Sequence, residues 1–193
     1  MGFELDGYIE AGAKLRREFF KLYRQKIYAV AEKLCEAIER GNKVILFGNG
    51  GSAADAIHIA AEFVNRFLRD REAWPAVALG TNISNLTSIA NDSDYEFVFS
   101  RELEALAKPG DVAIGISTSG RSKNVLRALE AARERDLYVV GFSGRDGGDM
   151  PELCHVCFVV RSDHTPLIQE IHITLGHVLC AMVEDKLASK KGL

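Results

Sequence analysis

The sequence predicts an α/β protein in which a parallel five-stranded sheet is covered by helices on both faces. Short apolar runs alternate with stretches of helical periodicity, as parallel strands joined by right-handed crossovers do. Glycine and hydroxyl residues follow several of these runs, which is typical of the ligand-binding carboxyl ends of such strands. The 193 residues, 47% of them hydrophobic, suffice for one sizeable core and predict a single domain over residues 1–193.

The chain is expected to begin with a long amphipathic segment, Tyr8–Glu39, as one helix or two within residues 1–40. Apolar residues recur there at intervals of three and four, the spacing of a helix with one apolar face. They are Phe19, Phe20, Tyr23, Ile27, Val30, Ala31, Leu34 and Ile38. Because this stripe exceeds what one face of a sheet needs, it predicts a contact between subunits. The α/β core is expected over residues 41–193.

The first strand and the helix after it are the central element of the predicted fold. Val44–Phe47 is expected to be a buried strand, Gly48–Gly51 a turn, and Ser52 the N-cap of an alanine-rich helix. A glycine turn before a helix presents backbone amides and the positive end of the helix dipole, which favours a bound anion. The turn matches neither GxGxxG nor GxxxxGK[ST], so dinucleotide and nucleoside triphosphate binding lose their main support.

His58 and Glu62 lie one turn apart on this predicted helix, so their side chains share one face. On an ordinary surface helix such a pair is most often solvated or packed. Close to an anion-binding turn, an imidazole and a carboxylate at this spacing favour a shared divalent metal, and the carboxylate can serve as a general base.

The remaining elements continue the alternation of strands and helices. They are a strand at Ala76–Leu79, a short helix at Ile83–Ala90, a helix at Tyr95–Ala107, strands at Asp111–Ser117, Leu137–Phe142 and His155–Val160, a helix at Val125–Arg135, and a last helix at about Pro166–Lys186. A polar cluster, Asn91–Asp94, is expected to form a turn close to the carboxyl end of a strand.

Four hydroxyl side chains fall within six residues between the third strand and its helix: Ser117, Thr118, Ser119 and Ser122. Helix capping by Ser119 or Ser122 would account for one of them. Hydroxyls and free amides at a helix start can hold the three oxygens of a phosphate without a metal. The excess over a simple cap therefore predicts a phosphate site.

The last helix carries Gln169, His172 and His177 among apolar residues, and buried polar groups need partners. Gln169 and His177 are eight residues apart, a rise of about 12 Å on a straight helix. Either their side chains converge on one ion, or they belong to a site shared between chains. The spacing leaves both arrangements open.

Charge and polarity exclude several functional classes. The formal net charge is −3, and lysine and arginine are scattered, so no nucleic-acid surface is expected. No apolar run is expected to reach membrane-spanning length, and Glu4, Asp6 and Glu10 stand where a signal peptide would carry positive charge. These features predict a cytoplasmic protein with no membrane partner.

Four cysteines, Cys35, Cys154, Cys157 and Cys180, are spread along the chain. Cys154 and Cys157 form a CxxC pair, but a zinc knuckle needs a second pair, and residues 155–160 predict a strand. A chain that builds its own core does not need a disulfide framework. Free, buried, structural thiols are therefore expected.

Four blocks of sequence together resemble the phosphoheptose isomerases of the sugar isomerase (SIS) domain superfamily. The blocks are GNGGSAADAIHIAAEF, IANDSDYEFVFSRELEAL, KPGDVAIGISTSGRSKNVLRALEAA and IQEIHITLGHVLCAMVE. The resemblance covers almost the whole chain and implies a single SIS domain that interconverts sedoheptulose 7-phosphate and D-glycero-D-manno-heptose 7-phosphate. It also implies heptose biosynthesis for lipopolysaccharide core or other surface glycans, a homotetramer with active sites between subunits, one zinc ion per subunit, and no nucleotide cofactor.

The resemblance also implies roles for individual residues. The family's metal ligands correspond to His58, Glu62, Gln169 and His177, and Glu62 and His177 are also its acid/base pair. Its substrate contacts correspond to Asn49, Gly50, Gly51, Glu62, Asn91, Asp92, Ser117, Thr118, Ser119, Ser122 and Gln169. The chain departs from the family's usual residues at Ile57, Asn82, Arg121 and Leu167, where Gln, Asp, Asn and Arg are common.

Two alternatives remain at this point. The DnaA initiator-associating proteins share the fold, lack the acid/base residues and act by binding a replication protein. Retention of Glu62 and His177 in this chain argues against that function. The second alternative is an isomerase of another phosphorylated ketose.

Overall fold

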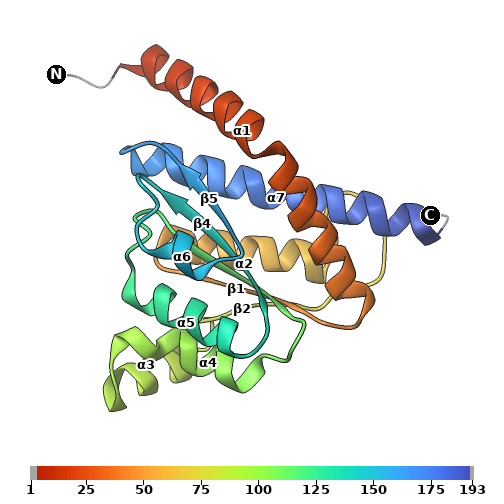
Figure 1. Ribbon diagram of the computed structural model, residues 1–193, viewed down its shortest axis with the longest axis vertical. Helices are drawn as coiled ribbons and strands as arrows, with labels where there is room; N and C mark the ends of the chain where they lie inside the picture. Colours follow the sequence, from red (N-terminus) through yellow and green to blue (C-terminus); the bar gives the residue numbers. More distant parts are fainter. Residues whose placement is uncertain (1–3, 192–193) are drawn as a thin grey trace.

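The computed structural model describes the chain from residue 4 to residue 191, and its side chains as far as residue 188 (Figure 1). In chain order its elements are α1 (Leu5–Glu39), β1 (Val44–Gly48), α2 (Gly51–Val64), β2 (Ala76–Ala78), α3 (Ile83–Asp92), the 3-10 helix η1 (Tyr95–Phe97), α4 (Val98–Leu106), β3 (Val112–Ser117), α5 (Lys123–Glu134), β4 (Tyr138–Gly144), α6 (Met150–Leu153), β5 (Val156–Val160) and α7 (Thr165–Lys191).

The five strands form one parallel sheet in the order β2-β1-β3-β4-β5, which confirms the predicted fold class. β1 and β3 are neighbours, with Val44 opposite Val112 and Gly48 opposite Ile116. The turns that follow these two strands consequently lie side by side at the carboxyl edge of the sheet. The chain adds β2 on one side of β1 and β3 on the other, and open α/β sheets bind ligands at such a switch point.

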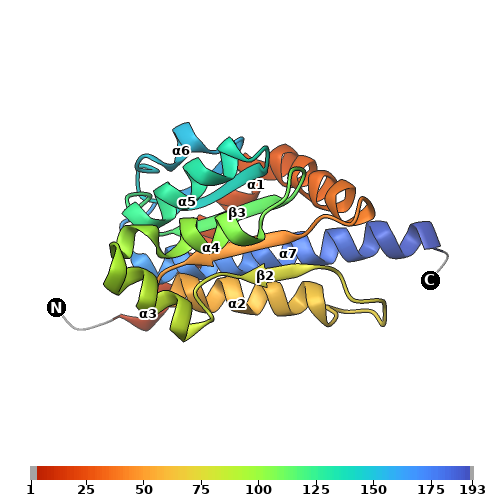
Figure 2. The same cartoon turned by 90° about the horizontal axis from the view of Figure 1, so that it is seen from below.

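Helices cover both faces of the sheet, as Figures 1 and 2 show. α1, α2 and α7 pack on one face, against side chains such as Leu46, Ile114 and Phe142. α4, α5 and α6 pack on the other face, against side chains such as Phe47 and Ala113. Successive strand residues enter opposite cores because side chains alternate along a strand. A parallel sheet buried on both faces is apolar throughout for the same reason.

α1 is one continuous helix, so the alternative of two helices is resolved. Its predicted apolar stripe is buried mainly against α7 and β5. The Tyr23 hydroxyl accepts a hydrogen bond from the Val159 amide at 3.2 Å, which ties the helix to the edge strand. Leu22 and Ile9 remain 68% and 54% exposed, so α1 also presents apolar side chains to the outside.

The start of α2 differs from the prediction. The helix begins at Gly51, Gly50 takes the N-cap position with a φ of 55°, and no side chain caps the helix. Ser52 is therefore not the cap; it lies buried in the first turn. Glycine adopts positive φ without the steric cost that other residues meet, so the chain turns into the helix earlier than the hydroxyl pattern suggests.

Two further elements differ from the predicted pattern. α3 continues to Asp92, so Asn91 and Asp92 close a helix and do not form a turn. Asp94 then caps η1, since its side chain accepts from the Glu96 amide. The four-residue helix α6 was not predicted, because four residues are too few to show a helical period.

The length of α7 contradicts the expectation that no apolar run reaches membrane-spanning length. Over Thr165–Ala188 this helix is long and apolar enough to cross a membrane by length and composition. Half of its apolar window is buried inside the protein, where it packs against α1 and α2, and it carries the buried polar residues His172 and Glu184. A buried core helix passes the same test of length, so the length is weak evidence for a membrane.

All four cysteines are free thiols. Cys35, Cys154 and Cys180 are buried, as predicted. Cys157 is only partly buried, because it lies on β5, an edge strand of the sheet.

Candidate active site

Two loops meet at the carboxyl edge of the sheet: the glycine turn (Asn49–Gly51) after β1 and the serine loop (Ser117–Ser122) after β3. The side-chain amides of Asn49 and Asn124 exchange two hydrogen bonds of 2.9 Å. The Tyr95 hydroxyl donates to Asn49 Oδ1 at 3.0 Å. Asn124 is buried, so the reciprocal pair joins the two loops firmly. Sequence reasoning missed Asn124 and Tyr95, although a polar residue in the first turn of α5 was a signal for the former.

The hydroxyls of the serine loop converge on one another. Ser117 Oγ lies 3.0 Å from Ser122 Oγ and 3.4 Å from Ser119 Oγ, and Thr118 is half-buried beside them. Ser122 occupies the N-cap of α5, but its side chain makes no capping bond. Hydroxyls gathered at the positive end of a helix dipole are an anion-binding arrangement.

Arg121 places a cation within the serine loop. Its guanidinium donates two hydrogen bonds to the Asp146 carboxylate, at 2.8 and 2.7 Å, and one to the Ser119 carbonyl at 3.2 Å. The Arg121 hydrogen bond and the Gly148 amide hold the pKa of Asp146 well below its usual range. Both partners are more than half exposed, so the pair adds little to stability. It fixes the position of the Arg121 side chain instead.

The side chain of Gln169, a residue of α7, packs against the start of α2. A Cβ on Gly51 would overlap the Gln169 side-chain amide, so glycine leaves the room that this amide occupies. Gly51 and His58 are seven residues apart, roughly 10 Å along a straight helix. Within one chain, Gln169 therefore belongs with the glycine turn, and His58 belongs to a second cluster further along α2.

The second cluster consists of His58, Glu62 and His177, and is called the dihistidine cluster below. His58 Nε2 lies 3.1 Å from Glu62 Oε1 and 3.4 Å from His177 Nε2. One ligand atom from each residue lies within 4.8 Å of the other two. His58 is exposed, and the other two residues are half-buried. The helical spacing predicted the first pair, and the packing of α7 beside α2 adds His177.

These side chains fit a divalent metal such as zinc. Zinc binds imidazole nitrogens at about 2.0–2.1 Å with tetrahedral geometry, which places two such nitrogens roughly 3.3 Å apart. The observed Nε2–Nε2 separation is 3.4 Å. Partial burial and the neighbouring His58 lower the pKa of His177, against the opposing effect of Glu62. A lowered pKa favours the neutral imidazole that a metal requires.

A glycine contact sets the distance between α2 and α7 at this cluster. A Cβ on Gly176 would overlap the Ile59 side chain, with Cγ1 only 2.7 Å away. Because Ile59 follows His58 and Gly176 precedes His177, the helices approach closely where the two histidines face each other. The His177 ring lies edge-on to His58, with centroids 4.9 Å apart, and Phe67 stacks on it at 5.5 Å.

Asn91 and Asp92 lie at the exposed end of α3. Asn91 Nδ2 donates to Asp92 Oδ1 at 2.8 Å. Asp92 also lines a surface hollow of about 470 Å³ formed by α3, α4 and the segment between them. No other predicted site residue lines this hollow. The described contacts of this pair therefore connect it to neither the serine loop nor the dihistidine cluster.

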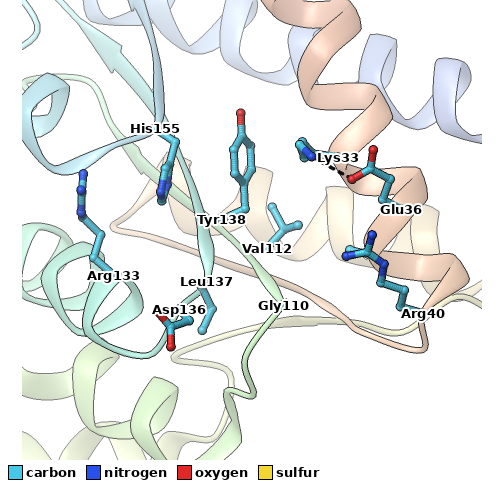
Figure 3. A pocket seen from close by; sticks show the side chains of 11 residues that line it. Lys33, Glu36, Arg40, Gly110, Val112, Arg133, Asp136, Leu137, Tyr138 and His155 are labelled. Atoms are coloured by element: carbon cyan, nitrogen blue, oxygen red, sulfur yellow. Dashed lines mark hydrogen bonds and ion pairs between the residues drawn. The ribbon is translucent and has the colours of Figure 1, made fainter.

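Another pocket of about 470 Å³ lies at the amino edge of the sheet (Figure 3). Tyr138 and His155 stack there with centroids 5.0 Å apart, and Arg40 and Arg133 extend on either side of them. None of the predicted site residues lines this pocket. The residues that the sequence singles out lie instead at the carboxyl edge and along α2 and α7.

Comparison with known proteins places these features in a family. A model of the SIS domain matches residues 7–144. A phosphoheptose isomerase from Desulfovibrio desulfuricans is 56% identical over 173 residues, covering 90% of this chain and 82% of that protein. A phosphoheptose isomerase from Aquifex aeolicus is 51% identical over 178 residues, covering 92% of this chain and 93% of that protein.

Solved structures agree with these relatives. Phosphoheptose isomerase from Neisseria gonorrhoeae has a TM-score of 0.88 at 38% identity, with 94% of this chain and 97% of that chain covered. The enzyme from Francisella tularensis has a TM-score of 0.90 at 28% identity, with 94% and 96% covered. The similarity therefore spans nearly the whole of each protein, and this chain belongs to the phosphoheptose isomerase family of SIS-domain proteins.

Proposed function

We propose that this protein is an isomerase that interconverts sedoheptulose 7-phosphate and D-glycero-D-manno-heptose 7-phosphate. The observation that carries the proposal is the meeting of Glu62 and His177, a carboxylate and an imidazole, in one cluster. An aldose-ketose isomerase needs such an acid/base pair and an anchor for the phosphate, and no nucleotide cofactor. The product would enter heptose biosynthesis for lipopolysaccharide core or other surface glycans.

The reaction moves one proton between neighbouring carbons. Glu62 removes a proton from C1 of the ketose while the N–H group of the neutral His177 ring supplies a proton to the oxygen on C2, which gives an enediol. Glu62 then returns its proton to C2, and the hydroxyl on C1 gives its proton to His177, which leaves an aldehyde at C1 and a hydroxyl on C2. Both side chains return to their starting states. Each general acid/base group contributes about 10²- to 10⁴-fold to the rate.

The substrate phosphate is proposed to bind the serine loop. The converging hydroxyls of Ser117, Ser119 and Ser122, with Thr118 beside them, support this assignment. A dianion is favoured at the N-terminus of α5 because of the helix dipole. The remaining proposed substrate contacts are Asn49, Gly50, Gly51, Glu62, Asn91, Asp92 and Gln169.

One zinc ion per subunit is proposed at the dihistidine cluster. Two imidazoles and a carboxylate suit zinc better than magnesium. When bound, the ion would act as a Lewis acid toward the oxygens of the enediol. Gln169, proposed as a fourth ligand, lies at the other end of the α2–α7 contact, so its participation calls for the Gln169 of a neighbouring chain.

The enzyme is proposed to be a cytoplasmic homotetramer with active sites between subunits. Each subunit is proposed to be one SIS domain over residues 1–193. Two features support the assembly. Leu22 and Ile9 present apolar surface on α1, and the site residues of one chain lie in separate groups. A neighbouring chain would cover the apolar surface and bring these groups together.

The experiment that tests the function is an assay of the purified full chain with sedoheptulose 7-phosphate, before and after treatment with a strong chelator. We expect conversion to the aldose, a large loss of activity on chelation, and recovery with zinc. Full activity in protein shown to be metal-free by elemental analysis would contradict the zinc proposal while leaving the isomerase intact. Absence of conversion by zinc-loaded protein would contradict the isomerase.

The two alternatives predict different results. A binding protein of the DnaA initiator-associating type would convert no sugar phosphate, and the paired Glu62 and His177 argue against it. An isomerase of another ketose would act on a five- or six-carbon ketose phosphate in preference to the heptulose. Comparing kcat/KM over a series of ketose phosphates distinguishes these cases.

A further inference from the structure

The carboxylate of Glu184 lies buried at the end of the α2–α7 contact, in a setting that the proposed reaction does not explain. Its side chain is 1% exposed. It accepts hydrogen bonds from three successive backbone amides, those of Phe67 at 3.0 Å, Leu68 at 2.7 Å and Arg69 at 3.0 Å. The carboxylate thereby holds the segment that follows α2 in one conformation.

Arg71 completes the setting of this carboxylate. Its Nε donates to Glu184 Oε1 at 3.2 Å, and its side chain is 4% exposed. Its guanidinium also donates to the carbonyl oxygens of Glu62 at 2.7 Å, Phe63 at 2.9 Å and Glu72 at 2.8 Å. Arg71 therefore caps the carbonyl end of α2, where the helix dipole is negative and a cation is favourable.

A buried ion pair is costly unless hydrogen bonds satisfy both partners. Here both oxygens of Glu184 have two donors each, and the Arg71 guanidinium lies over the Trp74 ring, 3.6 Å from its centroid. Burial alone would raise the pKa of Glu184, but the three amides and Arg71 lower it overall. A pair satisfied in this way is rigid, because any movement leaves a buried charge without a partner.

The buried pair of Glu184 and Arg71 is connected to the dihistidine cluster in two ways. Arg71 binds the backbone carbonyl of Glu62 itself. Phe67, whose amide Glu184 holds, stacks its ring on His177 with a centroid distance of 5.5 Å and an interplanar angle of 28°. One ligand is thus held through its main chain and another through the face of its ring.

We propose that Glu184, Arg71 and Phe67 form a positioning unit that holds Glu62 and the His177 ring in the geometry the dihistidine cluster needs. The proposal rests on the proposed metal-binding and acid/base roles of that cluster. The three residues are positioning residues, since none of them is placed against the substrate. Groups that orient metal ligands typically change metal affinity or activity by about 10- to 100-fold when they are altered.

Two substitutions remove different parts of the unit. Phe67→Leu removes the ring stacked on His177 and leaves the buried ion pair intact. Arg71→Lys keeps the charge but loses the planar fork that binds several carbonyls at once. Phe67→Tyr keeps the ring and serves as the conservative variant. Asp185→Asn is the matched control, because Asp185 is next to Glu184 and pairs with Arg69 at 2.7 Å, but the side chains of that pair are 46% and 68% exposed, unlike the buried pair of Glu184 and Arg71.

The measurements are zinc affinity of the purified full chain, by competition with a chromogenic chelator, and kcat and KM for the heptulose phosphate. We expect Phe67→Leu and Arg71→Lys to weaken zinc binding or lower kcat by about 10- to 100-fold. KM should change less than about twofold, because the serine loop lies beyond the other end of α2. Phe67→Tyr and Asp185→Asn should stay within about twofold of the original protein in both measurements.

Thermal unfolding checks that each variant is folded. If Arg71→Lys does not fold, Phe67→Leu alone tests the positioning unit. A folded Phe67→Leu variant with unchanged zinc affinity and kcat would overturn the proposal. If the unsubstituted protein binds zinc but converts no heptose phosphate, a loss of zinc affinity in Phe67→Leu, with none in Asp185→Asn, still supports the positioning unit. The failure of the proposed reaction is therefore distinguishable from the failure of this inference.

Discussion

Glu62 is proposed to be both a metal ligand and the general base of this site. Its carboxylate lies 3.1 Å from His58 as a proposed metal ligand, and the same oxygens are the proposed base for the proton on C1. Its main-chain carbonyl is held by Arg71 at 2.7 Å. A carboxylate that serves both purposes has to share its oxygens between the ion and the substrate, so activity and metal content need not rise in proportion.

Replacing Glu62 by Gln should abolish turnover while leaving the fold intact. The amide keeps the shape of the side chain but cannot accept the carbon-bound proton, so kcat should fall by about 10²-fold or more. Circular dichroism would check the fold, and a steady-state assay would measure the loss. Near-normal turnover in this variant would rule out Glu62 as the base.

Removing two hydroxyls of the serine loop should weaken substrate binding before it affects chemistry. For the double variant Ser119→Ala, Ser122→Ala, we expect KM to rise about 10²-fold or more, since two hydrogen bonds to a charged group are lost and each contributes about 1.5–3 kcal/mol. Ser88→Ala is a suitable control, because among the described residues that hydroxyl bonds the Asn85 carbonyl of its own helix and no part of the serine loop. An effect confined to kcat would place the phosphate elsewhere.

His172 should make stability depend on pH. Its Nε2 donates to the Ser143 carbonyl at 3.0 Å, while its buried Nδ1 has no partner among the described residues. Burial lowers its pKa to about 4, against the smaller opposing effect of the Ser143 bond, whereas the unfolded chain titrates near its ordinary value of about 6.5. The unfolded state therefore binds more protons between these values, and the stability present above about pH 6.5 is lost as the pH falls toward 4.

Between pH 6.5 and pH 4.5 the expected loss is about 2.7 kcal/mol, from two pH units at about 1.36 kcal/mol each. Urea unfolding at pH 7.5 and pH 4.5 measures it, and His172→Gln provides the comparison because glutamine can donate to Ser143 without titrating. That variant should show a smaller difference between the two pH values. An equal pH dependence in both proteins would mean that His172 is not the group responsible.

At the scale of secondary structure, the parallel contact of α2 and α7 builds the dihistidine cluster. Gln169 lies against Gly51, Gly176 against Ile59, and Glu184 against the segment after α2. Each contact marks a successive level along the same pair of helices. The contact at Gly176 is the one beside the two histidines, since Gly176 precedes His177 and Ile59 follows His58, so it sets how closely their rings approach.

Gly176→Ala should test this contact. Although alanine favours a helix more than glycine does, its Cβ would overlap the buried Ile59 side chain. We expect the free energy of unfolding to fall by about 1–3 kcal/mol, with weaker zinc binding. Gly12→Ala is a matched control in α1, where the nearest atom to a Cβ is the tip of Leu167 at 3.2 Å.

The same variant can be examined in a double-mutant cycle. Ile59→Ala removes both Cγ1 and Cδ1, the two atoms that the new Cβ would overlap, so Gly176→Ala should cost less in the Ile59→Ala protein than in the original one. Equal costs in both backgrounds would show that the close approach at Gly176 does not limit the helix separation.

At the scale of the whole molecule, the groups with proposed roles lie on one face of the sheet and at its carboxyl edge. The face covered by α1, α2 and α7 carries the dihistidine cluster and the positioning unit, and the carboxyl edge carries the serine loop. The surface of α1 also leaves Leu22, Ile9 and Tyr28 largely exposed. The proposed tetramer would bury such side chains at its subunit contacts.

Static light scattering of the purified chain at micromolar concentration should give a mass four times that of the 21.2 kDa subunit. Burial of the α1 side chains in the assembly is the physical reason, and Leu22→Lys should shift the distribution toward smaller species. A monomer as the principal species of the unsubstituted protein would contradict both the tetramer and the shared active site.

The sequence by itself determined the alternation of strands and helices, the glycine turn, the serine loop and the pairing of His58 with Glu62. These features depend on periodicity and on turn residues that act over a few positions. The sequence also carried the resemblance that named the acid/base pair. Where a local rule misled, as with Ser52 as a cap, the backbone freedom of Gly50 (φ 55°) outweighed the preference of a hydroxyl.

Only the tertiary structure decided which distant residues meet. Gln169 and His177 share one helix, yet packing places Gln169 at Gly51 and His177 at His58. The contact of Phe67 with Glu184 joins residues 117 positions apart, and no local pattern encodes it. Such contacts arise because α2 and α7 bury apolar side chains against the same sheet, and the polar residues on them meet as a consequence of that packing.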